Sequence, residues 1–259
     1  MPDAHDPIRR RAVVTGAASG IGHATAALLL ARGHAVLATD VAEAGLAPLA
    51  AAGAETCVAD LGTDAGRDRV VVAADALCRA AGAPLDWLVN AAGVIVLKPI
   101  GEVTGDDLRR AFDINVGSAF VLTQRLGERM RDGGAIVSFS SPSAKFVATP
   151  EAAAYALTKA AVSQVTRSFA KAYAPRGIRV NALSPGITDT PMQARVLREV
   201  SARRGIPEEQ LARERLATVP MGRSAPPEEI AGVVAWLLTD DAAYLTGQVL
   251  NVDGGMVMW

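Results

Sequence analysis

The chain has 259 residues, of which 50% are hydrophobic and 20% charged, and its formal net charge is −1. This composition is ample for a large buried core, and the lack of a basic stripe interleaved with aromatics argues against nucleic acid as a partner. No apolar run approaches the ~20 residues that a membrane helix needs, and residues 1–11 have no apolar core of a secretory signal. We therefore expect a soluble, cytoplasmic protein without a membrane partner.

Short apolar runs alternate with longer helical patterns along almost the whole chain. The runs lack alternating polar residues, which is typical of strands in a parallel sheet buried on both faces. The predicted strands are 12–15, 35–39, 56–59, 87–90, 135–139, 180–183 and 249–252. The predicted helices are 21–32, 44–52, 64–81, 105–131, 152–173 and 227–238. This order predicts an α/β fold, a doubly wound Rossmann sheet of about seven parallel strands with helices on both faces. With no linker or repeat, we expect one domain over 1–259.

The segment 190–222 departs from this rhythm, because it is charged and lies between the last two predicted strands. We expect it to be helical. Its arginines and glutamates are typical of a solvated surface, but an insertion after a sheet strand can also cover a ligand site. The sequence leaves both interpretations open, a surface helix pair or a lid.

A glycine-rich segment, TGAASGIG, joins the first predicted strand to the first predicted helix. Gly16, Gly20 and Gly22 permit a tight turn and a close approach of the backbone to a pyrophosphate. The helix that follows would supply free N–H groups to that anion. No Gly-Lys-Ser/Thr follows these glycines, which excludes a Walker-type phosphate loop.

Asp40 ends the second predicted strand, 18 residues beyond Gly22. A carboxylate at this place can accept hydrogen bonds from the adenosine ribose and would repel a 2′-phosphate. Neither Ser19 nor Val41 offers the positive charge that a 2′-phosphate requires. The sequence therefore favours NAD(H) over NADP(H), the alternative being that Asp40 only ends a strand.

Tyr155 and Lys159 lie four residues apart in an alanine-rich stretch with high helix propensity. Both side chains should therefore emerge from one face of a helix. An ammonium beside a phenol favours the phenolate and lowers the tyrosine pKa towards working pH. The pair predicts a device for proton transfer.

The cysteines and histidines show no pattern of a metal site or a disulfide framework. Cys57 and Cys78 have no metal-ligand spacing, and neither do His5, His23 and His34. We expect the two cysteines to be small buried side chains or free thiols, and we expect no metal.

Taken in order, the motifs of this chain resemble those of the short-chain dehydrogenase/reductase family, from Arg11 to Gly255. They are TGAASGIG at 15–22, Asp60-Leu61, NAAG at 90–93, Asn115, the serines near 141, Tyr155-x-x-x-Lys159, Pro185-Gly186 and TGQVLNVDGG at 246–255. The resemblance implies direct hydride transfer between NAD(H) and a secondary alcohol or ketone.

The resemblance also implies the catalytic roles. Tyr155 would be the general acid/base, and Lys159 would lower its pKa and hydrogen-bond the nicotinamide ribose. Asn115 would bend its helix and hold a water that links Lys159 to solvent; a purely structural buried amide is the alternative for Asn115.

The family's serine would orient the substrate oxygen and stabilise its developing charge. It usually lies thirteen residues before the tyrosine, where this chain has Pro142. Ser141 is the candidate because it directly follows a predicted strand. Ser143 remains the alternative, and Ser140 should point away if the strand alternates.

Cofactor contacts are implied after three of the predicted strands. Residues 60–61 would hold the adenine ring, residues 90–93 would pack against adenosine, and residues 187–188 would hydrogen-bond the carboxamide. The predicted cofactor-binding residues are Gly16, Ser19, Gly20, Ile21, Gly22, Asp40, Asp60, Leu61, Asn90, Ala91, Gly93, Tyr155, Lys159, Pro185, Gly186, Ile187 and Thr188.

The expected substrate is a polyol, sugar alcohol, cyclic diol or similar small secondary alcohol. A 3-oxoacyl-thioester reductase is the alternative, and the basic patch for its acyl carrier could come only from residues 195–215. Outside enzymes, the alternative is a non-catalytic NAD(H) sensor, against which the retention of both Tyr155 and Lys159 argues.

Substrate contacts are expected from residues 94–97, from Lys145, Phe146 and Val147, and from 190–220. Relatives are commonly tetramers of dimers built on the long helices that carry Asn115 and Tyr155, so we expect a homotetramer or homodimer. We expect the apolar tail at 256–259 to be buried at a subunit interface.

Overall fold

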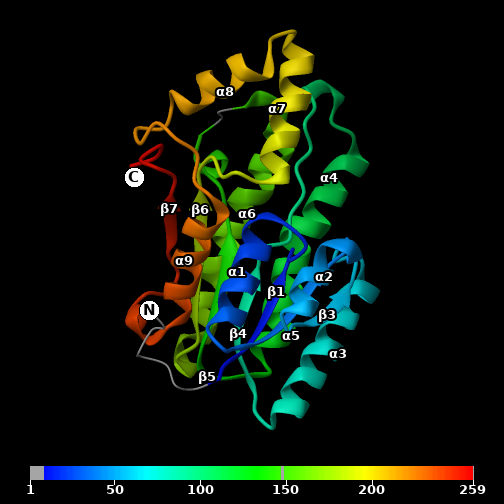
Figure 1. The fold of residues 1–259 in the computed structure, drawn as a ribbon, viewed down its shortest axis with the longest axis vertical. Coiled ribbons are helices and arrows are strands. Elements are labelled where there is room, and N and C mark those ends of the chain that lie inside the picture. Colours follow the sequence, from blue (N-terminus) through cyan, green and yellow to red (C-terminus); the bar gives the residue numbers. More distant parts are fainter. Residues whose placement is uncertain (1–8, 147–148, 259) are drawn as a thin grey trace.

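The computed structural model describes residues 9–146 and 149–258 (Figure 1). The expectations for the N-terminal residues, including His5, and for Val147 and Trp259 lie outside the described residues.

The described residues form a parallel sheet of seven strands in the order β3-β2-β1-β4-β5-β6-β7. The strands are β1 Arg11–Thr15, β2 Ala35–Asp40, β3 Glu55–Val58, β4 Leu85–Asn90, β5 Met130–Phe139, β6 Arg179–Pro185 and β7 Val249–Val252. The strand order reverses between β1 and β4, so the sheet is doubly wound as predicted.

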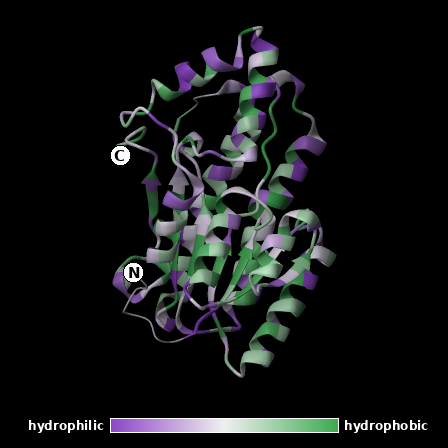
Figure 2. Ribbon diagram, in the orientation of Figure 1, coloured by the Kyte–Doolittle hydropathy of each residue, from purple (hydrophilic) through white to green (hydrophobic). Residues whose placement is uncertain are grey.

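Helices cover both faces of this sheet. They are α1 Gly20–Ala31, α2 Glu43–Ala51, α3 Asp64–Ala81, α4 Gly105–Phe112, α5 Ser118–Gly127, α6 Ala153–Tyr173, α7 Pro191–Arg204, α8 Glu208–Leu216 and α9 Pro227–Leu238. One hydrophobic core packs α1, α2 and α9 against the sheet, and the other packs α3, α5 and α6 against its opposite face. Figure 2 shows the hydrophobic strands enclosed by these helices.

Alternate side chains of the central strands serve the two cores. In β1, Ala12 and Val14 face α1 and α9, whereas Val13 belongs to the core under α3 and α5. In β5, Val137 and Ile136 divide in the same way. Because successive strand residues point to opposite faces, both faces need apolar residues, which explains the continuous apolar runs of the sequence.

The prediction of one helix over 105–131 is wrong in two places. Residues Asp113–Gly117 form a π turn between α4 and α5, and α5 ends at Gly127. Arg131 already belongs to β5, with its Nε 2.6 Å from a carboxylate oxygen of the fully buried Asp86. Residues 131–134, near the start of β5, are polar or glycine because they lie at the amino edge of the sheet, so an apolar run could not mark this part of the strand.

The segment 190–222 forms the helices α7 and α8. Its entry and exit lie side by side, since Thr188 pairs with Ala225 in an isolated parallel bridge. The Ala225 amide donates to the Ile187 carbonyl at 2.9 Å, and the Asp189 amide donates to the Ala225 carbonyl at 2.9 Å. We call these contacts the clamp.

Candidate active site

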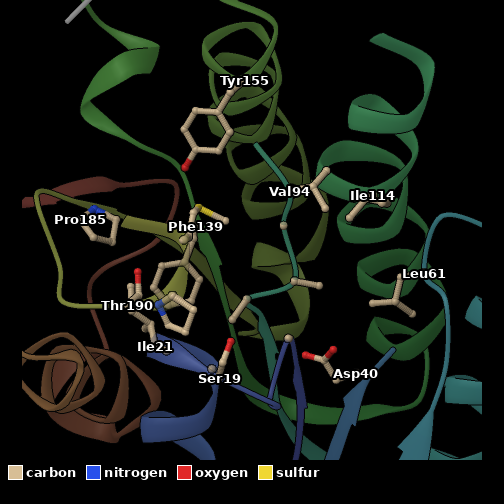
Figure 3. A pocket seen from close by; sticks show the side chains of 18 of the residues that line it. Ser19, Ile21, Asp40, Leu61, Val94, Ile114, Phe139, Tyr155, Pro185 and Thr190 are labelled. Carbon is tan, nitrogen blue, oxygen red and sulfur yellow. The ribbon is translucent and has the colours of Figure 1, made fainter. Parts of the chain in front are cut away.

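A cavity of about 350 Å³ lies at the carboxyl ends of β1, β4, β5 and β6. In Figure 3, Tyr155 lies towards one end of this pocket with its hydroxyl directed inward, and Asp40 lies towards the other end. Predicted residues that line it are Gly16, Ser19, Gly20, Ile21, Gly22, Asp40, Asp60, Leu61, Ala91, Gly93, Tyr155, Lys159, Pro185, Gly186 and Thr188. The pocket sits where the strand order reverses, the usual ligand site of open α/β sheets.

The glycines of the β1–α1 turn are required by close backbone packing. A Cβ on Gly16 would lie 2.6 Å from the Ala92 nitrogen, and one on Gly22 would lie 2.2 Å from the Gly16 oxygen. Gly16 also has a φ of 66°, which other residues rarely adopt. The turn therefore keeps bare backbone at the pocket, as a pyrophosphate requires.

The start of α1 is left open to the pocket. Thr63, Thr104 and Thr190 accept hydrogen bonds that cap α3, α4 and α7, but the Ser19 side chain makes no capping bond to α1. Because the first amides of a helix have no intrahelical acceptor, those of α1 can bind an anion in the cavity. The residues present thus fit the diphosphate of a dinucleotide.

Asp40 is held rigidly beside this turn. Its Oδ2 accepts from the Ala18 amide at 3.0 Å and its Oδ1 from the Ala42 amide at 3.0 Å. Both carboxylate oxygens are fixed by backbone while the residue lines the pocket. This geometry fits the ribose-binding role expected from the sequence.

The three candidate serines differ in what their hydroxyls contact. Ser140 lines the pocket, but its Oγ is 2.8 Å from Ser163 Oγ and donates to the Lys159 carbonyl at 3.0 Å, so its hydroxyl is engaged by α6. The Ser141 side chain hydrogen-bonds Tyr155 and accepts from the Ser143 amide at 3.2 Å. Ser141 is thus the serine that the structure brings to Tyr155.

The Lys159 side chain is buried beside the Tyr155 ring. Its Nζ donates to the Phe139 carbonyl at 2.8 Å and lies 5.4 Å from the centre of the Tyr155 ring. Burial lowers the pKa of Lys159 from 10.5 to about 8. The ammonium is therefore held at the end of β5, beside the phenol.

The expected lowering of the Tyr155 pKa is not found in the protein alone. Burial raises the pKa of Tyr155 to about 12, and the hydrogen bond with Ser141 offsets only part of that effect. The physical reason is that removing a phenolate from water costs more than one neutral hydrogen bond restores.

Asn115 lies in the π turn and is 2% exposed. Its Oδ1 accepts from the Val94 amide at 2.7 Å, and its Nδ2 donates to the Val94 carbonyl at 2.9 Å and to Thr158 Oγ1 at 2.9 Å. The side chain ties the π turn to the β4 loop and to α6. Its position near Lys159 follows from Gly93, where an added Cβ would lie 3.4 Å from Asn115 Oδ1 and 3.6 Å from Lys159 Nζ.

Two predicted cofactor residues do not line the pocket. The Asn90 side chain points into the layer under α5, where its Nδ2 donates to Thr123 Oγ1 at 3.1 Å and to Ser138 Oγ at 3.2 Å. Ile187 lies behind the wall, where it lines a second cavity. The sequence motif placed both at strand ends but could not show which way they face.

Arg110 lines the pocket and was not predicted. Its Nη2 donates to both carboxylate oxygens of Asp60, at 3.1 and 3.0 Å. A hydrogen bond from the Gly62 amide and the contacts with Arg110 lower the pKa of Asp60. No motif marks Arg110, because it lies on a charged helix 50 residues away from Asp60 in sequence.

The start of α7 forms part of the pocket wall, through Thr190, Pro191, Met192 and Gln193. A third hydrophobic cluster lies behind it, and we call it the lid cluster. It consists of Leu97, Ala152, Val196, Val200 and Leu211, with Ile95, Tyr155, Leu197 and Ile206 packed against it. The start of α7 thus lines the pocket beside Gly20, while the lid cluster packs against Tyr155, and we call residues 190–222 the lid.

Lys145, expected near the substrate, donates to Asn251 Oδ1 at 2.8 Å.

Among the described residues, no group of three or more His, Cys, Asp or Glu side chains could hold a metal ion. Within the same residues, no helix combines the length and the hydropathy needed to cross a membrane.

Comparison with known proteins identifies the class. Residues 16–257 match a family model described as enoyl-(acyl carrier protein) reductase. Cis-4-hydroxycyclohexanecarboxylate dehydrogenase of Sinomonas cyclohexanicum is 40% identical over 95% of this chain and 96% of that protein. Galactitol 2-dehydrogenase of Cereibacter sphaeroides is 38% identical over 96% of this chain and 95% of that protein.

A short-chain dehydrogenase from Burkholderia cenocepacia, solved in complex with NADP, superposes with a TM-score of 0.83 at 31% identity, covering 97% of this chain and 99% of that one. The chain thus belongs to the short-chain dehydrogenase/reductase family of oxidoreductases.

Proposed function

We propose that the protein transfers a hydride between NAD(H) and a small secondary alcohol or ketone, with Tyr155 as general acid/base. The observation that carries this proposal is that Tyr155 and Lys159 line one end of a cavity, with the Ser141 side chain in contact with Tyr155. The other end of that cavity holds a glycine-rich turn, an open helix N-terminus and Asp40.

When bound, the nicotinamide supplies or accepts the hydride at its C4. The residues of this chain handle the proton and the substrate oxygen. Tyr155 takes the hydroxyl proton during oxidation and returns it during reduction, while Ser141 holds the substrate oxygen beside it. The positive charge of Lys159, close to the Tyr155 ring, offsets part of the free-energy cost of forming a buried phenolate. We propose that Asn115 positions these groups through its bonds to the β4 loop and α6.

The choice of NAD(H) rests on charge at the adenosine end. Asp40 presents a carboxylate that repels a 2′-phosphate. The described cations that line the pocket are Lys159 and Arg110, and the guanidinium of Arg110 is already paired with Asp60. We therefore propose NAD(H), although the Burkholderia relative was solved with NADP.

The substrate is proposed to be an alcohol of the kind oxidised by the two named relatives. Both names denote dehydrogenases of hydroxylated carbon frames, one acyclic and one cyclic. Reduction of a 3-oxoacyl thioester is the second candidate, favoured by the description of the family model. We further propose a cytoplasmic homotetramer or homodimer.

Tyr155→Phe tests the proposed chemistry. We expect NADH to bind with nearly unchanged affinity while kcat falls at least about 10²-fold, because the ring remains and only the proton carrier is lost. Initial rates at 340 nm and NADH fluorescence titration measure the two effects. Near-normal turnover by this variant would exclude Tyr155 as the acid/base.

A further inference from the structure

The lid carries a desolvated arginine next to the pocket. Arg215, in the last turn of α8, donates from Nη2 to the Gln193 Oε1 at 2.9 Å. Gln193 lines the cavity, so the guanidinium lies one hydrogen bond behind the pocket wall. Burial lowers the pKa of the Arg215 guanidinium, and the nearby charge of Arg204 lowers it further.

Arg215 differs from three other arginines of the lid, which pair with carboxylates, and from Arg198 and Arg213, which form no ion pair within the described residues but are exposed. Arg195 pairs with Glu199, Arg203 with Glu102, and Arg204 with both carboxylate oxygens of Glu151 at 3.0 and 2.8 Å. Among residues 9–146 and 149–258, no carboxylate forms an ion pair with Arg215.

Two arginines that are more deeply buried than Arg215 are satisfied by several acceptors. Arg67 donates to the carbonyls of Leu61 and Asp113 and pairs with Asp64, and Arg179 donates to two carbonyls at the end of α9. Arg215 instead has one neutral hydrogen-bond partner, the side-chain amide oxygen of Gln193. A position in the last turn of a helix does not explain its burial, because Arg213 occupies the same turn and is exposed.

A partly desolvated guanidinium without a counter-ion destabilises a protein, and an anion supplied by a ligand removes that penalty. Guanidinium has five N–H donors in a planar fork that matches a carboxylate. Gln193 adds an amide N–H₂, since its oxygen already accepts from Arg215. Together the two side chains form a donor-rich patch, with Gln193 in the pocket wall and Arg215 directly behind it.

The cavity that Tyr155 and Gln193 both line also has apolar side chains in its wall, among them Val94, Pro191 and Met192. A ligand that reaches from Tyr155 to the patch must therefore pass apolar side chains. That arrangement suits a carbon frame with a carbinol at one end and an anionic group at the other.

We propose that Gln193 and Arg215 recognise a carboxylate on the substrate, so that the enzyme acts on hydroxy- or oxo-carboxylic acids with an apolar frame between the two groups. The assignment names the substrate class of the proposed dehydrogenase and rests on that function. It makes Arg215 a specificity-determining residue, outside the proton-transfer machinery.

Binding of unreactive probes tests this directly. Cyclohexanecarboxylate and cyclohexanecarboxamide are titrated by calorimetry into the whole protein saturated with NADH. We expect the carboxylate to bind at least about tenfold tighter, as charge-assisted hydrogen bonds do relative to neutral ones. Arg215→Gln should abolish this preference, and Arg213→Gln, the matched exposed control on α8, should retain it. Equal binding of the probes to the wild type, or an unchanged preference in Arg215→Gln, would overturn the assignment.

Arg215→Lys is a second variant that keeps the proposal testable if Arg215→Gln does not fold. It keeps the charge but loses the fork, so the preference for the carboxylate should fall several-fold without vanishing. Thermal unfolding of the ligand-free variants separates a structural role from recognition. A Tm for Arg215→Gln at or above that of the wild type supports recognition. A Tm several degrees lower, with the preference for the carboxylate kept by Arg215→Lys at full strength, identifies a structural arginine and contradicts the proposal.

Turnover distinguishes this inference from the proposed function. A hydroxycarboxylate and its amide are compared by kcat/KM, where the ratio should collapse in Arg215→Gln but persist in Arg213→Gln. Turnover of alcohols with no advantage for the carboxylate would overturn the inference alone. Absence of turnover with either cofactor, while the binding preference stands, would overturn only the proposed dehydrogenase.

Discussion

Asp40 combines a fixed position with a charge that supports the proposed preference for NAD(H). Its two oxygens accept from amides at 18 and 42, so the side chain cannot swing away from an incoming cofactor. A like charge a few ångströms away costs about 2–4 kcal/mol at the effective dielectric of a protein surface. That magnitude is enough to decide between two cofactors that differ by one phosphate.

Asp40→Asn should therefore reduce cofactor discrimination. The substitution keeps an oxygen acceptor and removes the charge, so the ratio of kcat/KM for NAD⁺ over NADP⁺ should fall at least about tenfold. Steady-state rates with both cofactors measure the ratio. Glu43→Gln removes a nearby exposed charge that does not line the pocket, and it should leave the ratio unchanged. An equal effect of both variants would contradict a specific role for Asp40.

Lys159 and Tyr155 make the stability of the protein depend on pH in opposite directions. With its pKa lowered from 10.5 to about 8, Lys159 stays charged in the unfolded chain at pH values where the folded chain has released the proton. The free energy of unfolding therefore rises with pH between about 8 and 10.5. Tyr155, whose pKa is raised from 10.0 to about 12, instead lowers that free energy above pH 10.

Lys159→Met should remove the first of these effects. At pH 7 the variant should be more stable than the wild type by on the order of 1–3 kcal/mol, less what is lost with the bond to the Phe139 carbonyl. The difference should narrow as pH rises from 8 to 9.5. Urea unfolding at several pH values measures it, with the exposed Lys171→Met as control. A difference that is constant with pH would show that the burial of charge is not the cause.

At the residue scale, spacing predicted much of the site from sequence. The Tyr155–Lys159 pair and the glycines of the first turn have local spacing that fixes which residues face together. Arg110, Gln193 and Arg215 had no such signal, because their neighbours in space are far away in sequence. The direction of the Tyr155 pKa shift could not be predicted from the motif either, because the burial of Tyr155 depends on the lid cluster around it.

At the scale of elements, the apolar strands were predictable because both faces of the sheet are covered. The π turn was not, since no residue type in DINVG forbids a regular helix. It inserts Asn115 between the β4 loop and α6, where its side-chain amide makes three hydrogen bonds with Val94 and Thr158. Turns of this kind are frequent at functional sites, where they redirect one side chain without ending the helix.

For the molecule as a whole, apolar side chains stay exposed on the face formed by α4, α5 and α6. Phe112, Phe120 and Leu157 are 36%, 43% and 56% exposed. Phe120 also packs edge-on against Phe169, with ring centres 4.9 Å apart, which stiffens the surface. This face lies on the helices on which we propose the homotetramer or homodimer to be built.

Leu157→Glu should weaken that assembly. Burial of a new charge opposes association, so the variant should sediment as a smaller species than the wild type at micromolar concentration. Tyr244→Glu changes a fully exposed side chain after α9 and serves as the control. A monomeric wild type, or assembly that resists Leu157→Glu, would contradict the proposed interface. The tail at 256–259 is predicted to be buried at a subunit interface. Of its described residues, Val257 is already buried within its own chain, whereas Met258 is 79% exposed.

The clamp at Thr188 and Ala225 has an evolutionary consequence. Because the lid leaves and re-enters the core at adjoining points, its length and sequence can diverge while the sheet and the cofactor turn keep their geometry. Within such a lineage, a new substrate range requires only changes between two fixed ends. The same junctions offer natural boundaries for transplanting the lid of one dehydrogenase onto the body of another.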